Sequence, residues 1–136
     1  MALKEKWIPI MMDIDKFKSV NDIYGHEEGD LVLKKFASIL LRYTTEDFMI
    51  FRYGGEEFLI LSKLSSSQTD RTIIDLFNVV RQELHTSDRK PRTISVGIGT
   101  YGTITDESIS IADKNLYFSK EHGRNRISKN NSVFYE

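Results

Sequence analysis

The stretch FMIFRYGGEEFLIL, residues 48–61, consists of two apolar runs on either side of a glycine pair. The runs 48–51 and 58–61 have the length and the aromatic or branched content of buried strands. Gly54 and Gly55 favour a tight turn between them, because both glycines can adopt a positive φ. The stretch therefore predicts a hairpin that carries Glu56 and Glu57 at its turn.

Alternating strands and helices surround this hairpin along the chain. An apolar run at 7–12 ends at Asp13 and predicts a buried strand. A second strand is expected at 93–100, and the polar residues 128–136 predict a frayed tail. Apolar residues at helical spacing predict helices at 15–23, 28–43, 69–86 and 107–121. This order indicates an α+β fold, a ferredoxin-like βαββαβ sandwich in which helices cover a central antiparallel sheet.

Length and composition limit the classes of protein that fit. A chain of 136 residues matches one compact domain, residues 1–136. It has no cysteine, which excludes disulfides and thiolate metal sites and agrees with a reducing cytoplasm. Lys and Arg number 19 against 20 Asp and Glu, so a nucleic-acid or anionic-membrane surface is not favoured. The longest apolar run, 7–12, is too short to span a bilayer, and we expect a cytoplasmic domain without membrane contact.

Asp13, Glu56 and Glu57 are the candidate metal ligands. They meet at one edge of the sheet if the first strand lies beside the hairpin. Hard divalent cations bind carboxylate oxygens together with substrate phosphates, so these acids suit a metal–nucleotide site. Acids at strand ends are also common because they are solvated, and a glycine pair is an ordinary turn. Spacing alone leaves both interpretations open.

Four motifs in the correct order resemble the GGDEF family of diguanylate cyclases. The turn Arg52–Phe58 is similar to the signature turn of that family in its Glu-Glu form, GGEEF. The remaining motifs are Asp13–Lys18 with Asn21-Asp22, Gly25-His26 and Gly29-Asp30; Thr93–Gly97; and Ala112-Asp113, Leu116-Tyr117, Lys120 and Gly123-Arg124-Asn125. The resemblance covers about residues 8–127. It implies the nucleotidyl cyclase fold, which is polymerase-palm-like, and the metal-dependent condensation of two GTP into cyclic di-GMP and two pyrophosphates.

The resemblance also assigns the metal site. Asp13, the carbonyl of Ile14 and Glu56 match its ligands for Mg²⁺ or Mn²⁺. Glu57 matches the acid that completes the metal site or helps to deprotonate the ribose 3′-hydroxyl. Gly54, Gly55 and Phe58 complete the signature turn.

The substrate residues follow in the same way. Asn21 and Asp30 match the guanine-reading pair, with Phe17 and Leu33 near the base. This agrees with chemistry, because a carboxylate accepts from guanine N1–H and its amino group, whereas adenine lacks that donor pair. Lys120 and Arg124 match the triphosphate-binding cations, with Lys16 and Phe17 at the same phosphates. Their spacing i and i+4 would place Lys120 and Arg124 on one helix face.

Each substrate residue also has a purely structural interpretation. Asp30 is a possible helix N-cap, Asn21 a turn former, and the two cations ordinary dipole-complementing surface charges. His26 and Asp113 are interpreted as architecture, and Asp15 is predicted to cap the helix that follows it.

Two features depart from the family pattern. Many members carry an Arg-x-x-Asp pair that binds cyclic di-GMP and inhibits the enzyme, but those positions are Thr45 and Phe48 here. We therefore expect no inhibitory product site. The usual N-terminal helix and Asp-x-Leu-Thr segment are also missing ahead of the first strand.

Three functions are compared. The first is a diguanylate cyclase that acts through a transient homodimer, with a sensory or dimerising domain in the parent protein. The second is a non-catalytic GTP-binding regulatory module, and the third a cyclase that accepts ATP with GTP, which Asp30 disfavours.

Overall fold

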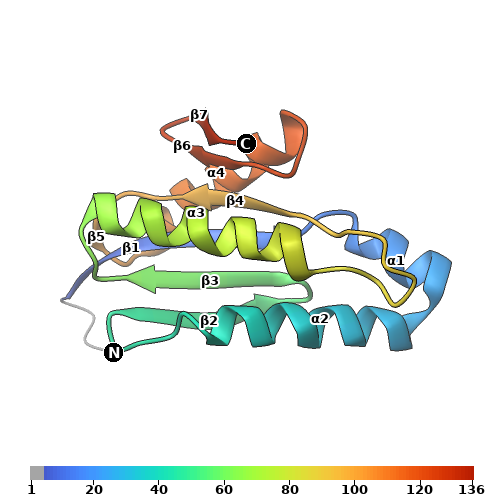
Figure 1. Ribbon diagram of the computed structural model, residues 1–136. Helices are drawn as coiled ribbons and strands as arrows, with labels where there is room; N and C mark the ends of the chain where they lie inside the picture. The colour runs from blue at the N-terminus through green and yellow to red at the C-terminus, as the bar shows by residue number, and fades with distance from the viewer. Residues whose placement is uncertain (1–4) are drawn as a thin grey trace.

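A mixed sheet forms the centre of the computed structural model, which describes residues 5–136 (Figure 1). Within this range the elements, in chain order, are β1 (Lys6–Ile14), α1 (Phe17–Tyr24), α2 (His26–Leu41), β2 (Phe48–Gly54), β3 (Glu57–Ser62), α3 (Ser66–Glu83), β4 (Ile94–Ile98), β5 (Gly102–Thr103), α4 (Asp106–Glu121), β6 (Ile127–Lys129) and β7 (Ser132–Tyr135). The expectation about the segment ahead of the first strand falls largely on residues 1–4, which lie outside the described residues.

The strand order β2-β3-β1-β4-β6-β7 places β1 at the centre of the sheet, and β5 pairs with the start of β1. The pairs β2–β3, β3–β1 and β1–β4 are antiparallel, whereas β6 runs parallel to β4. The βαββαβ core and its antiparallel central sheet are confirmed. Because β1 lies between β3 and β4, its C-terminal end reaches the sheet edge beside the β2–β3 turn.

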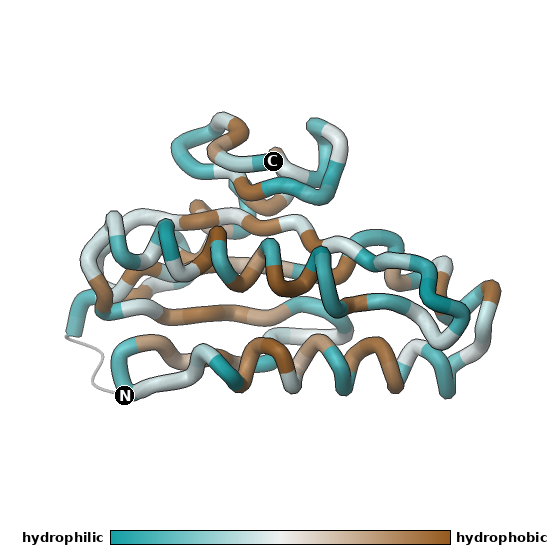
Figure 2. Tube along the Cα trace, viewed as in Figure 1, coloured by the Kyte–Doolittle hydropathy of each residue, from teal (hydrophilic) through white to brown (hydrophobic). Residues whose placement is uncertain are grey.

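Side chains alternate across β1 and so contribute to two hydrophobic clusters. Ile10, Met12 and Ile14 face the larger cluster, which includes residues of α1, α2 and α3. Trp7 and Met11 face a smaller cluster, which α4 closes with Ala112 and Leu116. Figure 2 shows the hydrophobic colour concentrated along the central strands. Asp13 has the same parity as Met11 and therefore lies on the α4 face of the sheet.

Helices α3 and α4 begin at capping boxes. The Ser65 hydroxyl accepts from the Gln68 amide at 3.2 Å, and the Gln68 side chain accepts from the Ser65 amide at 3.4 Å. Thr105 and Ser108 make the equivalent pair at the start of α4. The polar run 65–67 is thus the start of α3, three residues before the predicted position, because its serines satisfy the free helical amides.

The prediction of a frayed tail was wrong. Residues 127–135 form the β6–β7 hairpin, and Asn130 and Asn131 turn it with φ values of 54° and 57°. Two consecutive positive φ values are typical of a hairpin turn that matches strand twist. Tyr135 packs edge-on against Phe77, with ring centroids 5.9 Å apart. The polar composition concealed this hairpin, since its stability comes from contacts with α3 and from pairing with β4.

No helix within residues 5–136 is both long and apolar enough to cross a bilayer.

Candidate active site

The centre of the candidate site is the carboxylate of Asp13 near the end of β1. Antiparallel pairing places Asp13 directly opposite Glu57 of β3, as the sequence predicts for neighbouring strands. Asp13 is only 2% exposed, and its Oδ2 forms an ion pair with Lys120 of α4. Its Oδ1 is buried and has no hydrogen-bond partner within residues 5–136. One oxygen of a buried carboxylate therefore remains available to a further cation or donor.

The electrostatics of Asp13 follow from this position. Burial raises the pKa of Asp13 to about 6, although its hydrogen bond and ion pair with Lys120 oppose the shift. Asp15 and Glu56 add smaller negative potentials that raise the pKa further. Glu56 makes the smallest of these contributions, and it directly precedes Glu57, the residue paired with Asp13. A divalent cation bound here would relieve both the burial cost and the repulsion.

The β2–β3 turn has Gly55 and Glu56 at its centre. Of the two glycines, Gly55 has a left-handed φ, at 38°, and Gly54 does not. The pairing register of β2 with β3 shifts between Arg52 and Gly54, directly before the turn. Arg52 donates from Nε and Nη2 to the Gly55 carbonyl at 3.0 and 2.7 Å. The guanidinium thus holds the loop that carries Glu56, a role that sequence reasoning missed.

The residues present fit a divalent cation that is shared with a substrate. Within residues 5–136, no three His, Asp or Glu side chains are grouped closely enough to hold a metal ion by themselves. The unpartnered Asp13 Oδ1 and the nearby Glu56 supply hard oxygen ligands. Mg²⁺ commonly uses one or two carboxylates plus substrate phosphates, which matches this donor set. The roles of Asp13, the Ile14 carbonyl, Glu56 and Glu57 as metal ligands stay predictions.

Asp15 does not cap α1, contrary to prediction. The N-cap of α1 is Lys16, with φ 55° and no side-chain cap. Asp15 is buried and accepts from Thr93 Oγ1 at 2.7 Å, Ser95 Oγ at 2.5 Å and the Asn125 amide at 2.9 Å. A buried carboxylate is stabilised by several such donors. Asp15 therefore joins the end of β1 to β4 and to the loop that follows α4.

Lys120 and Arg124 do not share a helix face. Helix α4 ends at Glu121, and Gly123 turns the chain with φ 119°. The Arg124 amide then donates to the Ser119 carbonyl at 2.9 Å, as in a Schellman C-cap. Arg124 itself has φ 60°, so it lies in the loop beyond the helix. The i, i+4 spacing failed here because the glycine ends the helix before the second cation.

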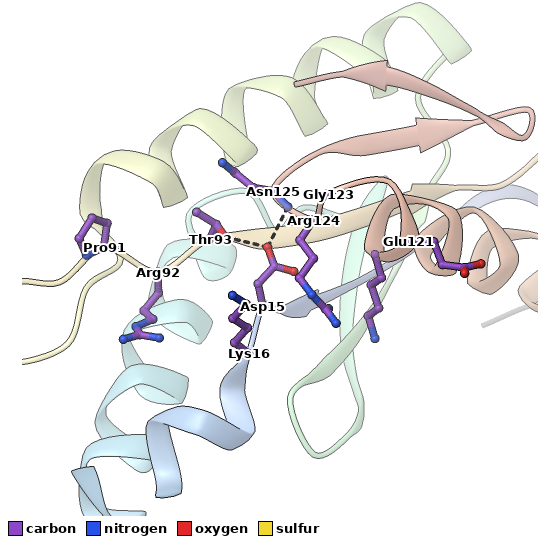
Figure 3. Close-up of a pocket in the computed structure, with 10 residues that line it drawn as sticks. Asp15, Lys16, Pro91, Arg92, Thr93, Glu121, Gly123, Arg124 and Asn125 are labelled. Atoms are coloured by element: carbon purple, nitrogen blue, oxygen red, sulfur yellow. Dashed lines mark hydrogen bonds between the residues drawn. The ribbon is translucent and has the colours of Figure 1, made fainter. Parts of the chain in front are cut away.

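The loop after α4 nevertheless brings both cations to one pocket of about 460 Å³ (Figure 3). The lining residues are Asp15, Lys16, Pro91, Arg92, Thr93, Lys120, Glu121, Gly123, Arg124 and Asn125. Arg81 of α3 holds this loop by donating to the Asn125 side chain at 3.0 Å and to its carbonyl at 3.2 Å. Four cationic side chains and two carboxylates line the pocket, so it favours an anion. Sequence reasoning predicted Lys16, Lys120 and Arg124 here but missed Arg92.

The predicted guanine residues lie on α1 and α2. Asn21 packs against Gly29 so closely that a Cβ on Gly29 would lie 1.9 Å from the Asn21 Oδ1. Asp30 and Leu33 share a pocket of about 310 Å³ with Lys34, Ala37, Arg52 and Phe58. Phe17 is a core residue, 8% exposed. The structure thus places Asp30 and Leu33 together, whereas Asn21 lies against Gly29 and does not line that pocket.

Two residues that the sequence analysis interprets as architecture are exposed, and one of them, Asp113, lines a pocket with Glu57. His26 is the exposed first residue of α2, and Asp113 is an exposed residue of α4. Phe48 is buried in the core, and Thr45 forms a bridge with it at the start of β2. A buried phenyl ring offers no charged contact to a nucleotide. The expectation that no inhibitory product site is built at these positions stays a prediction.

Known proteins resemble the chain over nearly all of its length. The sequence profile described as "Diguanylate cyclase, GGDEF domain" matches residues 2–126. Diguanylate cyclase A of Treponema denticola is 38% identical over 136 aligned residues, which cover 94% of this chain and 37% of that protein. Diguanylate cyclase DgcZ of Escherichia coli is 34% identical over 122 residues, covering 86% of this chain and 41% of that protein. The chain thus spans about two fifths of the length of these curated relatives.

A solved structure agrees with these relatives. The GGDEF domain of DgcB from Caulobacter crescentus, in complex with c-di-GMP, superposes with a TM-score of 0.81. It is 28% identical, and the match covers 91% of this chain and 75% of that one.

Proposed function

The chain belongs to the GGDEF family of diguanylate cyclase domains, and from this premise we propose that it condenses two GTP molecules into cyclic di-GMP and two pyrophosphates. The observation that carries the proposal is the buried Asp13, with one unpartnered oxygen, directly opposite Glu57 at the sheet edge. Lys120 is paired with the Asp13 Oδ2, but the buried Oδ1, without a partner among residues 5–136, remains costly until a donor or a second cation binds it. A cationic pocket beside it supplies the complementary site for a triphosphate.

Asp13 and Glu56, with the Ile14 carbonyl, are the proposed holders of Mg²⁺ or Mn²⁺. When bound, the cation supplies charge neutralisation at the reacting phosphate and lowers the pKa of a coordinated hydroxyl. Lys120 neutralises Asp13 in the structure and lines the adjacent pocket, so its ammonium is placed to serve the carboxylate or a phosphate. Arg52 keeps Glu56 at its position by holding the Gly55 carbonyl.

The proposed reaction is an in-line displacement at phosphorus. The 3′-hydroxyl oxygen of one GTP forms a bond to the α-phosphorus of the other, and the bond from that phosphorus to the pyrophosphate oxygen breaks. The hydroxyl proton passes to the carboxylate of Glu57 and then to solvent. The same displacement in the opposite direction closes the ring. Lys16, Lys120 and Arg124 hold the triphosphate so that pyrophosphate leaves with its negative charge compensated.

Guanine is the proposed base because the base-side pocket presents a carboxylate. Asp30 accepts from the N1–H and amino donors of guanine, and Asn21 serves the adjacent edge. Leu33 forms an apolar wall of the same pocket. An adenine ring offers no such pair of donors, and Asp30 would then lose its partners.

A dimer is part of the proposal, since each domain holds one GTP and two must meet. The partner is a second copy of the domain, brought close by a sensory or dimerising domain that raises the effective concentration. A cytoplasmic site is proposed because GTP is the substrate. Neither nucleic acid nor a membrane surface is a proposed partner.

The test is turnover by the purified chain at high concentration with GTP and Mg²⁺. Cyclic di-GMP and pyrophosphate are separated by chromatography for the parent, Glu57→Gln and Glu56→Gln. Glu46→Gln is the matched control, because it removes the same charge from an exposed position ahead of β2. Removing a positioned proton acceptor reduces turnover by roughly 10²–10⁴-fold. The turnover of Glu57→Gln should therefore be at least about 10²-fold below that of the parent, and the turnover of Glu46→Gln should equal that of the parent.

The two alternatives give different results in this experiment. A regulatory module binds GTP saturably but forms no product, even when a fused dimerising domain brings two copies together. A cyclase of relaxed specificity forms a mixed product when ATP is added with GTP. Equal turnover by Glu57→Gln and Glu46→Gln would contradict the assigned role of the turn.

A further inference from the structure

Arg92 lies two residues before β4, in the segment between α3 and β4, and this segment contacts several other elements of the fold. Its amide donates to the Leu84 carbonyl at the end of α3, at 2.8 Å. In the same α3–β4 segment, Asp88 accepts from the Tyr24 hydroxyl at 2.8 Å, and the Ser87 amide donates to Glu28 at 3.3 Å. The segment is thus attached to both α1 and α2. These contacts fix the position of the Arg92 backbone, from which its side chain extends into the pocket lined by Asp15.

The guanidinium of Arg92 lacks the partners that such a group usually has. Its Nε is buried and has no hydrogen-bond partner within residues 5–136. None of the ion pairs formed in that part of the chain involves Arg92. A buried donor without an acceptor is destabilising, and such groups are uncommon in native proteins. The side chain is therefore a candidate for contact with a ligand.

The pocket that Arg92 lines does not neutralise it. Asp15, the buried acid on the pocket wall, already accepts from three donors. Figure 3 shows Pro91 and Arg92 on one side of Asp15, with Arg124 and Glu121 on the other. Lys16 and Lys120 add two more positive charges to the same wall. The pocket is thus cationic on both sides of Asp15.

We propose that Arg92 is a further phosphate-binding residue of this chain and contacts the terminal phosphates of the bound nucleotide; this inference rests on the proposed function. A guanidinium fits phosphate oxygens through two parallel hydrogen bonds. The reacting α-phosphate belongs near Asp13, whose carboxylate is paired with Lys120. Arg92 lies across Asp15 from Arg124 (Figure 3), so it meets the far end of the triphosphate. The side chain then distinguishes GTP from nucleotides with fewer phosphates.

The test compares the affinities of GTP, GDP and GMP by calorimetry, with Mg²⁺ present, for the parent and Arg92→Gln. Lys90→Gln is the matched control, because it removes the same charge from the same segment at a position that does not line the pocket. Loss of one charge-assisted contact weakens binding by roughly 10-fold. GTP affinity should fall by that factor in Arg92→Gln, GMP affinity should not change, and Lys90→Gln should match the parent. Equal GTP affinities for Arg92→Gln and Lys90→Gln would overturn the inference.

Two further measurements keep the outcome interpretable. Arg92→Lys preserves the charge but not the two-pronged contact, so its GTP affinity should lie between the parent and Arg92→Gln; parent-like affinity in both variants overturns the proposal. Inorganic tripolyphosphate probes the pocket without a base. If GTP fails to bind the parent but tripolyphosphate binds in an Arg92-dependent way, the proposed function fails and the phosphate site stands. If neither binds, the phosphate site fails as well.

Discussion

Gly97 in β4 permits the closest backbone contact between the sheet and α4, and its replacement by alanine tests how that contact supports the site. A Cβ at position 97 would lie 2.0 Å from the Leu116 amide nitrogen and 2.3 Å from the Ala112 carbonyl oxygen. Ordinary contacts of a Cβ begin near 3.4 Å. Both clashing atoms belong to a helix backbone, so no side-chain rotation relieves the overlap. Helix α4 must therefore move away from β4.

The loss in free energy of unfolding can be worked out from the contacts between α4 and β4 that this movement disturbs. Overpacking of a well-packed core costs about 1–3 kcal/mol. Two buried hydrogen bonds also join α4 to β4 beside Gly97, from Asn115 to the Ile98 carbonyl and from Ser119 to the Val96 carbonyl, each 2.8 Å long. Each bond contributes about 1 kcal/mol. Gly97→Ala is therefore expected to lower the free energy of unfolding by about 3–5 kcal/mol.

The measurement is urea unfolding of the parent and of a glycine series. Gly102→Ala is the control, because a Cβ there has nothing within 4 Å. It should be within about 0.5 kcal/mol of the parent, as is usual for surface substitutions. Gly99→Ala should be intermediate, since its Cβ would lie 2.9 Å from both the ring and the carbonyl of Pro9. A Gly97→Ala variant as stable as Gly102→Ala would refute the reasoning about α4.

Three other perturbations address different parts of the molecule. Asp15→Asn should lower the free energy of unfolding by about 2–4 kcal/mol in urea titrations, because the amide N–H groups of asparagine would face the Thr93, Ser95 and Asn125 groups that donate to Asp15. An unchanged urea midpoint would contradict the stabilising role of these hydrogen bonds. Gly29→Ala should weaken GTP binding roughly 10-fold with little loss of stability, because its Cβ would displace the Asn21 side chain; parent-like calorimetric affinity would remove Asn21 from the site. Burial and the hydrogen bond to Asp75 raise the pKa of Tyr43 from 10.0 to about 12. The neutral phenol is thus favoured in the folded state, and the stability advantage over Tyr43→Phe should be full below pH 10 and disappear as the pH rises towards 12. A pH-independent difference would contradict this assignment.

The connections around Asp15 explain why stability and site geometry are linked here. Asp15, Arg81 and the Schellman turn all act on the loop that carries Arg124. Their contacts hold Arg124 and Asn125 at φ values of 60° and 50°, which are uncommon for residues with side chains. Weakening any one contact therefore affects the position of a phosphate-binding cation as well as the free energy of unfolding.

Local patterns in the sequence were sufficient for the order of the core helices and strands and for the family, but not for β5 or the β6–β7 hairpin. The apolar runs around Gly54 and Gly55 predicted the hairpin, because strand periodicity and turn chemistry are encoded within a few residues. The acid that ends the first apolar run and the acids of the turn predicted a shared edge, and the register confirms that Asp13 faces Glu57. These predictions needed only the assumption that β1 and β3 are neighbours.

The tertiary structure alone decided the contacts between distant segments. Asp15 is a clamp rather than a cap because it meets the Asn125 amide, 110 residues away. The β6–β7 hairpin forms because α3 and β4 supply its contacts, whereas its own composition is polar. Arg124 leaves the helix face because Gly123 adopts a positive φ, and Arg92 reaches the pocket through the attachment of its segment to α1 and α2. The periodicity of a sequence indicates which face of a helix or strand is apolar. It does not indicate which distant side chains the strand register and the packing bring into contact with that face.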